Sequence, residues 1–153
     1  FARYGVMHRN TFINAPKLLT PELRLRSTAG VDVPVFVAGQ LAGTEGYCEA
    51  IRSGLHAALN VAALLGGVEA PQLPAETAFG ALLAYATSPG TVDYQPMHVN
   101  FGIMEPLEQR IRNKGQRYAA YAERGAQAFE RYCDELRACG LLGCAGEAVG
   151  HDA

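Results

Sequence analysis

The stretch from Val33 to Tyr47 decides the predicted fold and reads VPVFVAGQLAGTEGY. Its first part, 33–39, is rich in valine and ends in glycine, a pattern typical of a short buried strand. Over residues 45–65, polar residues recur every three or four positions, which predicts an amphipathic helix. Gly66 and Gly67 would end that helix. The stretch therefore predicts one strand-turn-helix unit.

The helix predicted over 45–65 has two unlike faces. We expect its polar face to lie in solvent and its apolar face to be buried in the core. The polar face consists of Glu45, Glu49, Arg52, Ser53, His56 and Asn60. The apolar face consists of Tyr47, Ile51, Leu55, Ala58, Val61, Ala62 and Leu65.

The turn between the predicted strand and helix is a candidate ligand site. Gly39, Gly43 and Gly46 would let backbone N–H groups approach a ligand at a helix start, where the helix dipole favours negative charge. The spacing is not that of the G-x-G-x-x-G dinucleotide fingerprint. Glu45 and Glu49 would repel a pyrophosphate, so a less charged ligand atom fits better. Because such glycines also occur in structural turns, the residues alone leave both interpretations open.

The rest of the chain is predicted to be mostly helical. A second helix is expected over about 75–86, after a proline. The connection that follows, 87–104, carries aromatic and apolar residues, which favours a functional loop. A last helix is predicted over about 105–138, with Pro106 in its first turn. The Gly-rich end, 139–153, is expected to be a flexible tail.

The composition limits the partners of the chain. Its 153 residues carry a net charge of −2, so nucleic acid could be bound only by a local basic patch. No apolar run reaches the ~20 residues of a membrane-spanning helix, so no membrane is expected as a partner. The four cysteines have no C-x-x-C spacing, which predicts reduced thiols and no metal site. Because the chain begins with Phe1, we expect it to be part of a longer gene product.

Several short segments of the sequence resemble one protein family. They are YGVMHRNTFINAP at 4–16, VFVAGQ at 35–40, EGY at 45–47, SGL at 53–55, ETA at 76–78, QPM at 95–97 and VNFG at 99–102. Together they cover about residues 1–132 and resemble the bacterial FAD- and folate-dependent tRNA (uracil-5-)-methyltransferases, the TrmFO family. GidA-type flavoproteins, which modify the tRNA wobble uridine, are similar in the glycine segment. The segment at 8–14 resembles the methyltransferases more than the GidA-type flavoproteins.

The resemblance implies a fold and a reaction. The chain would be an α/β fragment, the C-terminal part of a glutathione-reductase-like FAD-binding fold, mostly helical after one strand-turn-helix unit. The whole enzyme would form 5-methyluridine at position 54 in the T loop of tRNA, in the cytoplasm. The carbon would come from 5,10-methylenetetrahydrofolate, and FAD would carry electrons from NAD(P)H. The catalytic residues would lie outside this chain, so the fragment alone would be inactive.

The resemblance also implies binding residues. FAD would lie along Gly39, Gln40, Gly43, Thr44, Glu45, Gly46 and Tyr47. The N–H groups at the helix start would stabilise the negative charge that grows on a flavin as it is reduced. His8 would lie where the folate pteridine stacks, supported by Arg9 and Asn10. Without the resemblance, His8 would be interpreted as a surface or structural histidine.

The last predicted helix carries a basic stripe. At 100° per residue, one face would hold Arg110, Lys114, Arg117, Arg124 and Arg131, with Tyr121 among them. The buried face would consist of Leu107, Ile111, Tyr118, Ala122, Phe129 and Cys133. The candidates for contact with tRNA phosphates are Arg110, Lys114, Arg117 and Arg124. The alternative is a solvated surface with ordinary ion pairs.

The resemblance finally implies a division of the chain. Residues 1–70 would be the C-terminal segment of the FAD-binding domain with the folate-pocket residues, and residues 71–138 a helical C-terminal region before the tail. The missing N-terminal part of the same polypeptide would be a partner. The non-enzyme alternative is a helical module whose apolar face binds another polypeptide.

Overall fold

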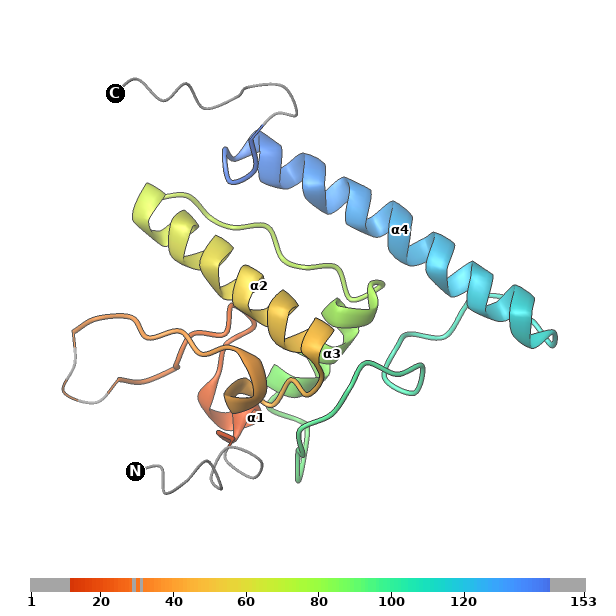
Figure 1. The fold of residues 1–153 in the computed structure, drawn as a ribbon, viewed down its shortest axis with the longest axis horizontal. Helices are drawn as coiled ribbons and strands as arrows, with labels where there is room; N and C mark the ends of the chain where they lie inside the picture. Colours follow the sequence, from red (N-terminus) through yellow and green to blue (C-terminus); the bar gives the residue numbers. More distant parts are fainter. Residues whose placement is uncertain (1–11, 29, 31, 144–153) are drawn as a thin grey trace.

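The computed structural model describes residues 12–28, 30 and 32–143. Over these residues the chain forms α1 (Ala15–Leu18), the 3-10 helix η1 (Gly39–Ala42), α2 (Tyr47–Gly66), α3 (Ala78–Thr87) and α4 (Lys114–Ala138). In Figure 1, α2 crosses the middle of the molecule and α4 runs along its outside. The predicted mostly helical character is confirmed.

The strand predicted over 33–39 is wrong. In the described part of the chain, extended pairing is limited to three isolated bridges, one of which joins Arg24 to Phe36. A strand needs a continuous ladder and a buried face. Pro34 has no N–H to donate, and the Val33 side chain is 62% exposed. The segment is therefore extended chain, and the β part of the predicted α/β unit does not form.

The helix predicted over 45–65 is confirmed as α2, but its buried face is the opposite of the predicted one. Tyr47, Ile51 and Leu65 are 92%, 74% and 82% exposed. The buried residues of α2 are Glu49, Ser53, His56, Ala57, Leu59, Asn60 and Ala63. The pattern separated the two faces correctly but predicted the wrong one to be buried.

Hydrogen bonds explain how the polar face of α2 is buried. The His56 ring Nε2 lies 2.9 Å from the Pro21 carbonyl oxygen, and the Asn60 side-chain amide donates to the His56 carbonyl at 2.9 Å. Burial lowers the pKa of His56 below its usual value, which keeps the ring neutral near pH 7. Buried polar groups with partners do not bear the full cost of desolvation, so this face can meet the core.

The second and last helices begin later than predicted. α3 begins at Ala78 rather than at 75, because the Thr77 hydroxyl accepts a hydrogen bond from the Gly80 N–H at 3.0 Å and caps the helix. α4 begins at Lys114 rather than at 105, with Asn113 as its cap. The predicted end of the last helix, at 138, is confirmed.

Two clusters of buried side chains hold the described residues together. The larger cluster joins α1, η1 and α3 with the following connection, and consists of Ala15, Leu19, Leu23, Ala42, Leu83, Ala86 and Tyr94. It contains side chains from before and after residue 70. The smaller cluster joins α2 to the C-terminal half of α4 and consists of Leu59, Tyr132 and Leu136. The N-terminal end of α4 therefore projects away from the rest of the molecule (Figure 1).

The buried face of α4 is also rotated from the predicted one. The buried residues of α4 are Ala128, Tyr132 and Leu136. Of the residues predicted to be buried, Tyr118 and Phe129 are 38% and 43% exposed. Two arginines of the basic stripe, Arg117 and Arg124, are half-buried.

Candidate functional site

Buried hydroxyl groups hold the turn that precedes α2. Ser53 Oγ accepts a hydrogen bond from the Gly39 N–H at 2.7 Å and donates to the Ala50 carbonyl at 2.8 Å. Thr44, which is fully buried, donates through Oγ1 to the Gly39 carbonyl at 2.9 Å and lies 3.3 Å from Ser53 Oγ. One serine of α2 thus fixes both ends of the turn.

The connection after α3 clamps the same turn from the other side. The Tyr94 hydroxyl donates to the Gly43 carbonyl at 2.7 Å, and burial raises the pKa of Tyr94 to about 12. Gly43 has φ +84°, and a Cβ there would lie 2.5 Å from the Tyr94 ring. Met97 pairs with the turn through Glu45 N–H, which donates to the Met97 carbonyl at 3.1 Å. The backbone of the turn is therefore held by hydrogen bonds to Tyr94 and Met97, and the Tyr94 ring leaves no space for a side chain at residue 43.

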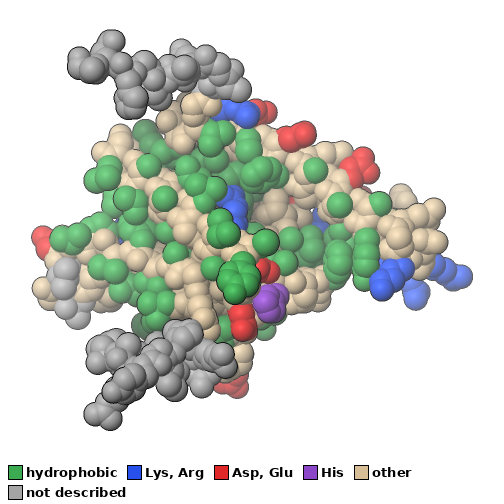
Figure 2. All heavy atoms as spheres, in the orientation of Figure 1, with side chains coloured by type: hydrophobic (Ala, Val, Ile, Leu, Met, Phe, Trp, Pro, Cys, Tyr) green, Lys and Arg blue, Asp and Glu red, His purple; other side chains and the backbone are tan. Residues whose placement is uncertain are grey.

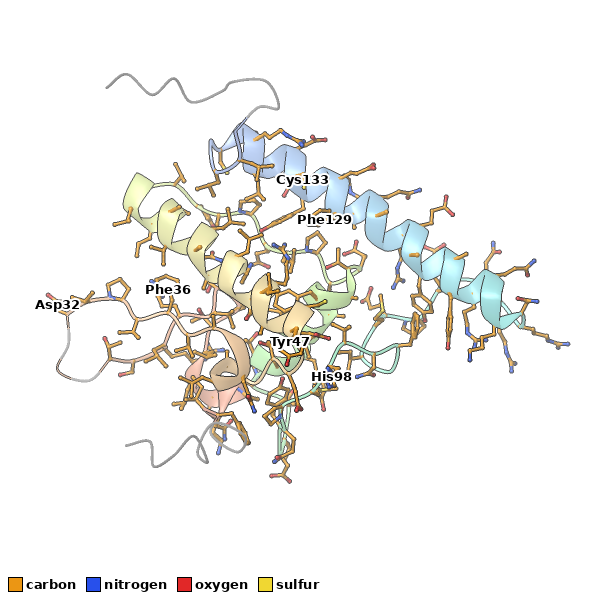
Figure 3. All side chains as sticks on the ribbon, viewed as in Figure 1. Asp32, Phe36, Tyr47, His98, Phe129 and Cys133 are labelled. Carbon is orange, nitrogen blue, oxygen red and sulfur yellow. The ribbon has the colours of Figure 1, made fainter. Side chains whose placement is uncertain are left out.

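The start of α2 offers backbone N–H groups beside an exposed aromatic ring. Gly46 precedes the helix with φ +101°, and no side chain caps it. The first N–H groups of a helix have no partner within the helix. The Glu49 carboxylate lies at this helix start: Oε1 accepts from the Val99 N–H at 3.2 Å and lies 3.9 Å from His98 Nδ1, and Oε2 lies so close to Gly46 that a Cβ there would overlap it. Figure 3 shows Tyr47 and His98 at this same end of the molecule.

The structure brings the predicted turn residues together, from Gly39 to Tyr47. The three residues predicted for the folate side, His8, Arg9 and Asn10, lie outside the described residues. Sequence reasoning missed Ser53, which was assigned to the exposed face, and Tyr94, which was assigned no role. Ser53 lies in a sequence segment that carries the family resemblance, and Tyr94 lies next to one. A matching segment does not show which residues are in contact.

The basic stripe differs from its prediction, because Arg110 lies in the connection before α4. Arg117 Nη1 donates to the Ile111 carbonyl at 3.2 Å, and Arg124 Nη2 donates to the Glu105 carbonyl at 2.8 Å. Both arginines therefore fasten the connection 105–111 to α4.

Stacked aromatic rings add to the contact between α4 and the connection that precedes it. Phe101 lies parallel to Tyr118, with ring centroids 4.4 Å apart and an angle of 5° between the planes. Lys114 Nζ lies 5.4 Å from the Tyr118 ring centroid. Arg131, further along α4, lies 4.0 Å from Glu76 Oε1. Figure 2 shows basic side chains gathered at the projecting end of the molecule.

Metal ligands, cysteines and apolar helices bear on other classes of site in the part of the chain that the structure describes. No group of three or more His, Cys, Asp or Glu side chains there could hold a metal ion. Cys48, Cys133 and Cys139 are free thiols. None of the helices there is long and apolar enough to cross a membrane.

Residues 1–69 match the family model described as glucose inhibited division protein A. Two relatives named methylenetetrahydrofolate–tRNA-(uracil-5-)-methyltransferase TrmFO are 47% identical to the chain. The one from Desulforudis audaxviator matches over 136 residues and the one from Heliobacterium modesticaldum over 135; each match covers 88% of this chain and 30% of the relative. A TrmFO from Bacillus cytotoxicus is 46% identical over 130 residues, 85% of this chain and 29% of the relative.

The resemblance to the TrmFO family is confirmed. The chain spans about 30% of the length of these TrmFO relatives. The glycine turn lies within the segment that the family model matches, whereas α3 and α4 lie after it.

Proposed function

We propose that the chain is part of a flavin- and folate-dependent tRNA methyltransferase of the TrmFO type. The observation that carries this proposal is the 47% identity over 136 residues to relatives with that name. The whole enzyme would transfer a one-carbon unit from 5,10-methylenetetrahydrofolate to uracil C5, at position 54 of the tRNA T loop. NAD(P)H would be the reductant, and the enzyme would act in the cytoplasm, where tRNA is processed.

The turn before α2 fits the edge of a flavin. FAD would supply the electrons that reduce the transferred carbon to a methyl group. The N–H groups at the uncapped start of α2 would stabilise negative charge on the reduced ring, and Tyr47 offers an exposed ring beside them. The Glu49 carboxylate lies at the same helix start, with Oε1 accepting from the Val99 N–H and Oε2 next to Gly46, so the ligand atom received there would carry only part of a negative charge. His8, Arg9 and Asn10 remain the residues proposed for the folate side.

The basic residues near the start of α4 are proposed to contact tRNA phosphates. Arg110 and Lys114 are exposed. Arg117 and Arg124 use part of their guanidinium groups to hold the connection, and a guanidinium has five N–H donors. Both therefore keep donors for phosphate oxygens.

The exposed apolar face of α2 is proposed to pack against the remainder of the same polypeptide. Ile51, Leu55 and Leu65 are 74%, 52% and 82% exposed. The relatives are about three times as long as the matched segment, so further chain is present there to cover such a face. In this proposal residues 1–70 and 71–138 keep the separate roles given above, and the catalytic groups lie outside this chain.

The test uses the product of the complete gene. We expect the purified protein to be yellow, and to form 5-methyluridine at position 54 of an unmodified tRNA transcript when it is given methylenetetrahydrofolate and NADH or NADPH. Nuclease digestion followed by mass spectrometry measures the position. A colourless protein that leaves the transcript unmodified would overturn the proposal and favour the helical interaction module.

The second candidate is a GidA-type flavoprotein that modifies the wobble uridine. The family model that matches residues 1–69 favours it, because its description is glucose inhibited division protein A. The same digest separates the two candidates, since modification would then occur in the anticodon loop instead of the T loop.

A further inference from the structure

An aromatic cleft separates the N-terminal half of α4 from the rest of the molecule. Its volume is ≈ 670 Å³, within the ~300–1,000 Å³ typical of pockets that hold small organic groups. Five rings line it: Phe79, Phe101, Tyr118, Tyr121 and Phe129. They come from α3, α4 and the connection between them, and Figure 3 shows Phe129 between α4 and α2.

The half-buried side chain of Arg52 lies at the wall of the aromatic cleft, and one nitrogen of its guanidinium group is fully buried. Arg52 Nη2 is buried and has no hydrogen-bond partner. The guanidinium carbon is 5.6 Å from the Phe129 ring centroid and 5.9 Å from that of Phe79. A buried donor without an acceptor costs about 1–3 kcal/mol, so a ligand oxygen that accepted from Arg52 would bind favourably.

A second cavity adjoins the aromatic cleft and is basic. It has a volume of ≈ 560 Å³, is lined by Arg110, Arg112 and Arg117, and shares Tyr121 with the aromatic cleft. Glu108 is its one lining carboxylate. Residues 109–122 contain four cationic side chains and no acidic one, although the whole chain has a net charge of −2. The two cavities thus place stacking rings beside a site for an anion.

We propose that the aromatic cleft receives one unpaired base of tRNA, and that the basic cavity holds the phosphate next to that base. Proteins recognise unstacked bases by stacking them on aromatic rings and arginine planes, and by hydrogen bonds to base edges. Arg52 would donate to a carbonyl oxygen of the base. A base inside a duplex could not enter the cleft. The proposal rests on the proposed function only for the identity of the RNA.

Charge favours RNA over a polypeptide as the occupant. An apolar peptide would cover the rings but would supply neither an acceptor to Arg52 Nη2 nor a further anion to the three arginines of the adjoining cavity. A nucleotide supplies the acceptor and the anion together, since its base carries an aromatic ring and a carbonyl oxygen and its phosphate is negatively charged.

The test measures RNA binding by the product of the complete gene, separately from methylation. The probes are a short fluorescein-labelled oligouridylate and an RNA duplex of the same length, titrated at several salt concentrations. We expect the single strand to bind more tightly than the duplex. Phe101→Leu should weaken single-strand binding about tenfold without changing the dependence of log K on log salt, because it removes stacking and no charge.

Arginine variants report on the other half of the site. Arg110→Gln and Arg112→Gln should each reduce the salt slope by about 0.7, the value for one lost phosphate contact on a single strand. Arg52→Gln should weaken the single strand and leave that slope unchanged. The matched controls are Phe36→Leu and Arg24→Gln, which change the same residue types outside both cavities.

Equal binding of single strand and duplex would overturn the proposal. So would a folded Phe101→Leu protein with unchanged affinity, as expected if polypeptide fills the cleft. If Phe101→Leu lowers the melting temperature, weaker RNA binding would also be expected from partial unfolding. The RNA affinity of Arg52→Gln then decides the test. Methylation is scored independently: an enzyme that methylates tRNA but shows none of these effects refutes the cleft alone. A protein that shows them without methylating tRNA refutes the proposed function alone.

Discussion

The glycine turn before α2 and the aromatic cleft beside α4 are stabilised in different ways. Buried hydroxyl groups hold the turn: Thr44 is part of it, Ser53 contacts it from α2, and Tyr94 contacts it from the connection after α3. The cleft is held by ring contacts and by arginines that reach backbone carbonyls, with Phe101 and Phe129 45% and 43% exposed. Buried hydrogen bonds fix one geometry, whereas partly exposed rings and long side chains can rearrange.

The difference matches the two ligands that we propose. A flavin edge is rigid, and N–H groups that stabilise its charge must be in place before reduction. An RNA loop is flexible, and a base that is flipped out of its stack needs a cleft that closes around it. The predictions below test whether the two regions differ in this way.

The largest effect is expected from Gly43→Ala. The left-handed backbone at this position costs alanine about 1–2 kcal/mol, and the new methyl group would overlap the Tyr94 ring. We expect the free energy of unfolding to fall by about 3 kcal/mol in urea titrations, with loss of bound flavin. Gly54→Ala is the control, because nothing lies within 4 Å of a Cβ there and α2 should gain about 0.5–1 kcal/mol. Similar results for both variants would show that the turn is not rigid.

Ser53→Ala should have the next largest effect. It leaves the Gly39 N–H without its acceptor, inside a turn where water has little access. The expected loss in the free energy of unfolding is about 2 kcal/mol. Ser27→Ala, at an exposed serine, should change it by less than about 0.5 kcal/mol. If the two serine variants unfold alike, the hydroxyl network does not hold the turn.

Tyr94→Phe has a smaller effect that depends on pH. At pH 8 it should cost about 1 kcal/mol, the net value of the lost hydrogen bond to Gly43. The folded pKa of about 12 lies above the usual tyrosine pKa of 10.0, so the tyrosine stabilises the protein fully below pH 10. This contribution is lost as pH rises from 10 toward 12. The stability difference between wild type and variant should therefore close near pH 11, and a constant difference would contradict the raised pKa.

The sequence predicted the turn and α2 well, because local residues determine both. Glycines at 43 and 46 adopt φ values that other residues rarely adopt, and Gly67 ends the helix in the same way. The buried face of α2 could not be predicted, since periodicity shows that two faces differ but not which one meets a neighbour. The partners of the buried polar face, Pro21 and Gly39, are distant in sequence.

The failures at the strand and at α4 have other causes. The residues at 33–39 have strand propensity, but a strand also needs a partner ladder, and the described chain supplies one bridge there. The start of the last helix was assigned to Pro106, a residue that suits a first turn without requiring one. Asn113, three residues before Gln116, was the better signal, since its side chain accepts from the Gln116 N–H at 3.1 Å. The cleft could not be predicted, because its rings come from three separate segments.

The smallest effect is expected from Arg124→Gln, which probes how the cleft region is held. Arg124 donates to the Glu105 and Pro106 carbonyls across an exposed surface. Exposed interactions of this kind contribute little, so the free energy of unfolding should fall by less than about 1 kcal/mol. Amide hydrogen exchange in 105–111 should become faster, because that connection loses a fastening to α4.

Arg137→Gln is the matched control for Arg124→Gln. It removes an exposed ion pair with Asp134 near the other end of α4, and it should leave exchange in 105–111 unchanged. If Arg124→Gln instead lowered the free energy of unfolding as much as Ser53→Ala, the cleft would be as rigid as the turn. The contrast between a fixed flavin turn and an adaptable RNA cleft would then fail, because both regions would depend on interactions of equal strength.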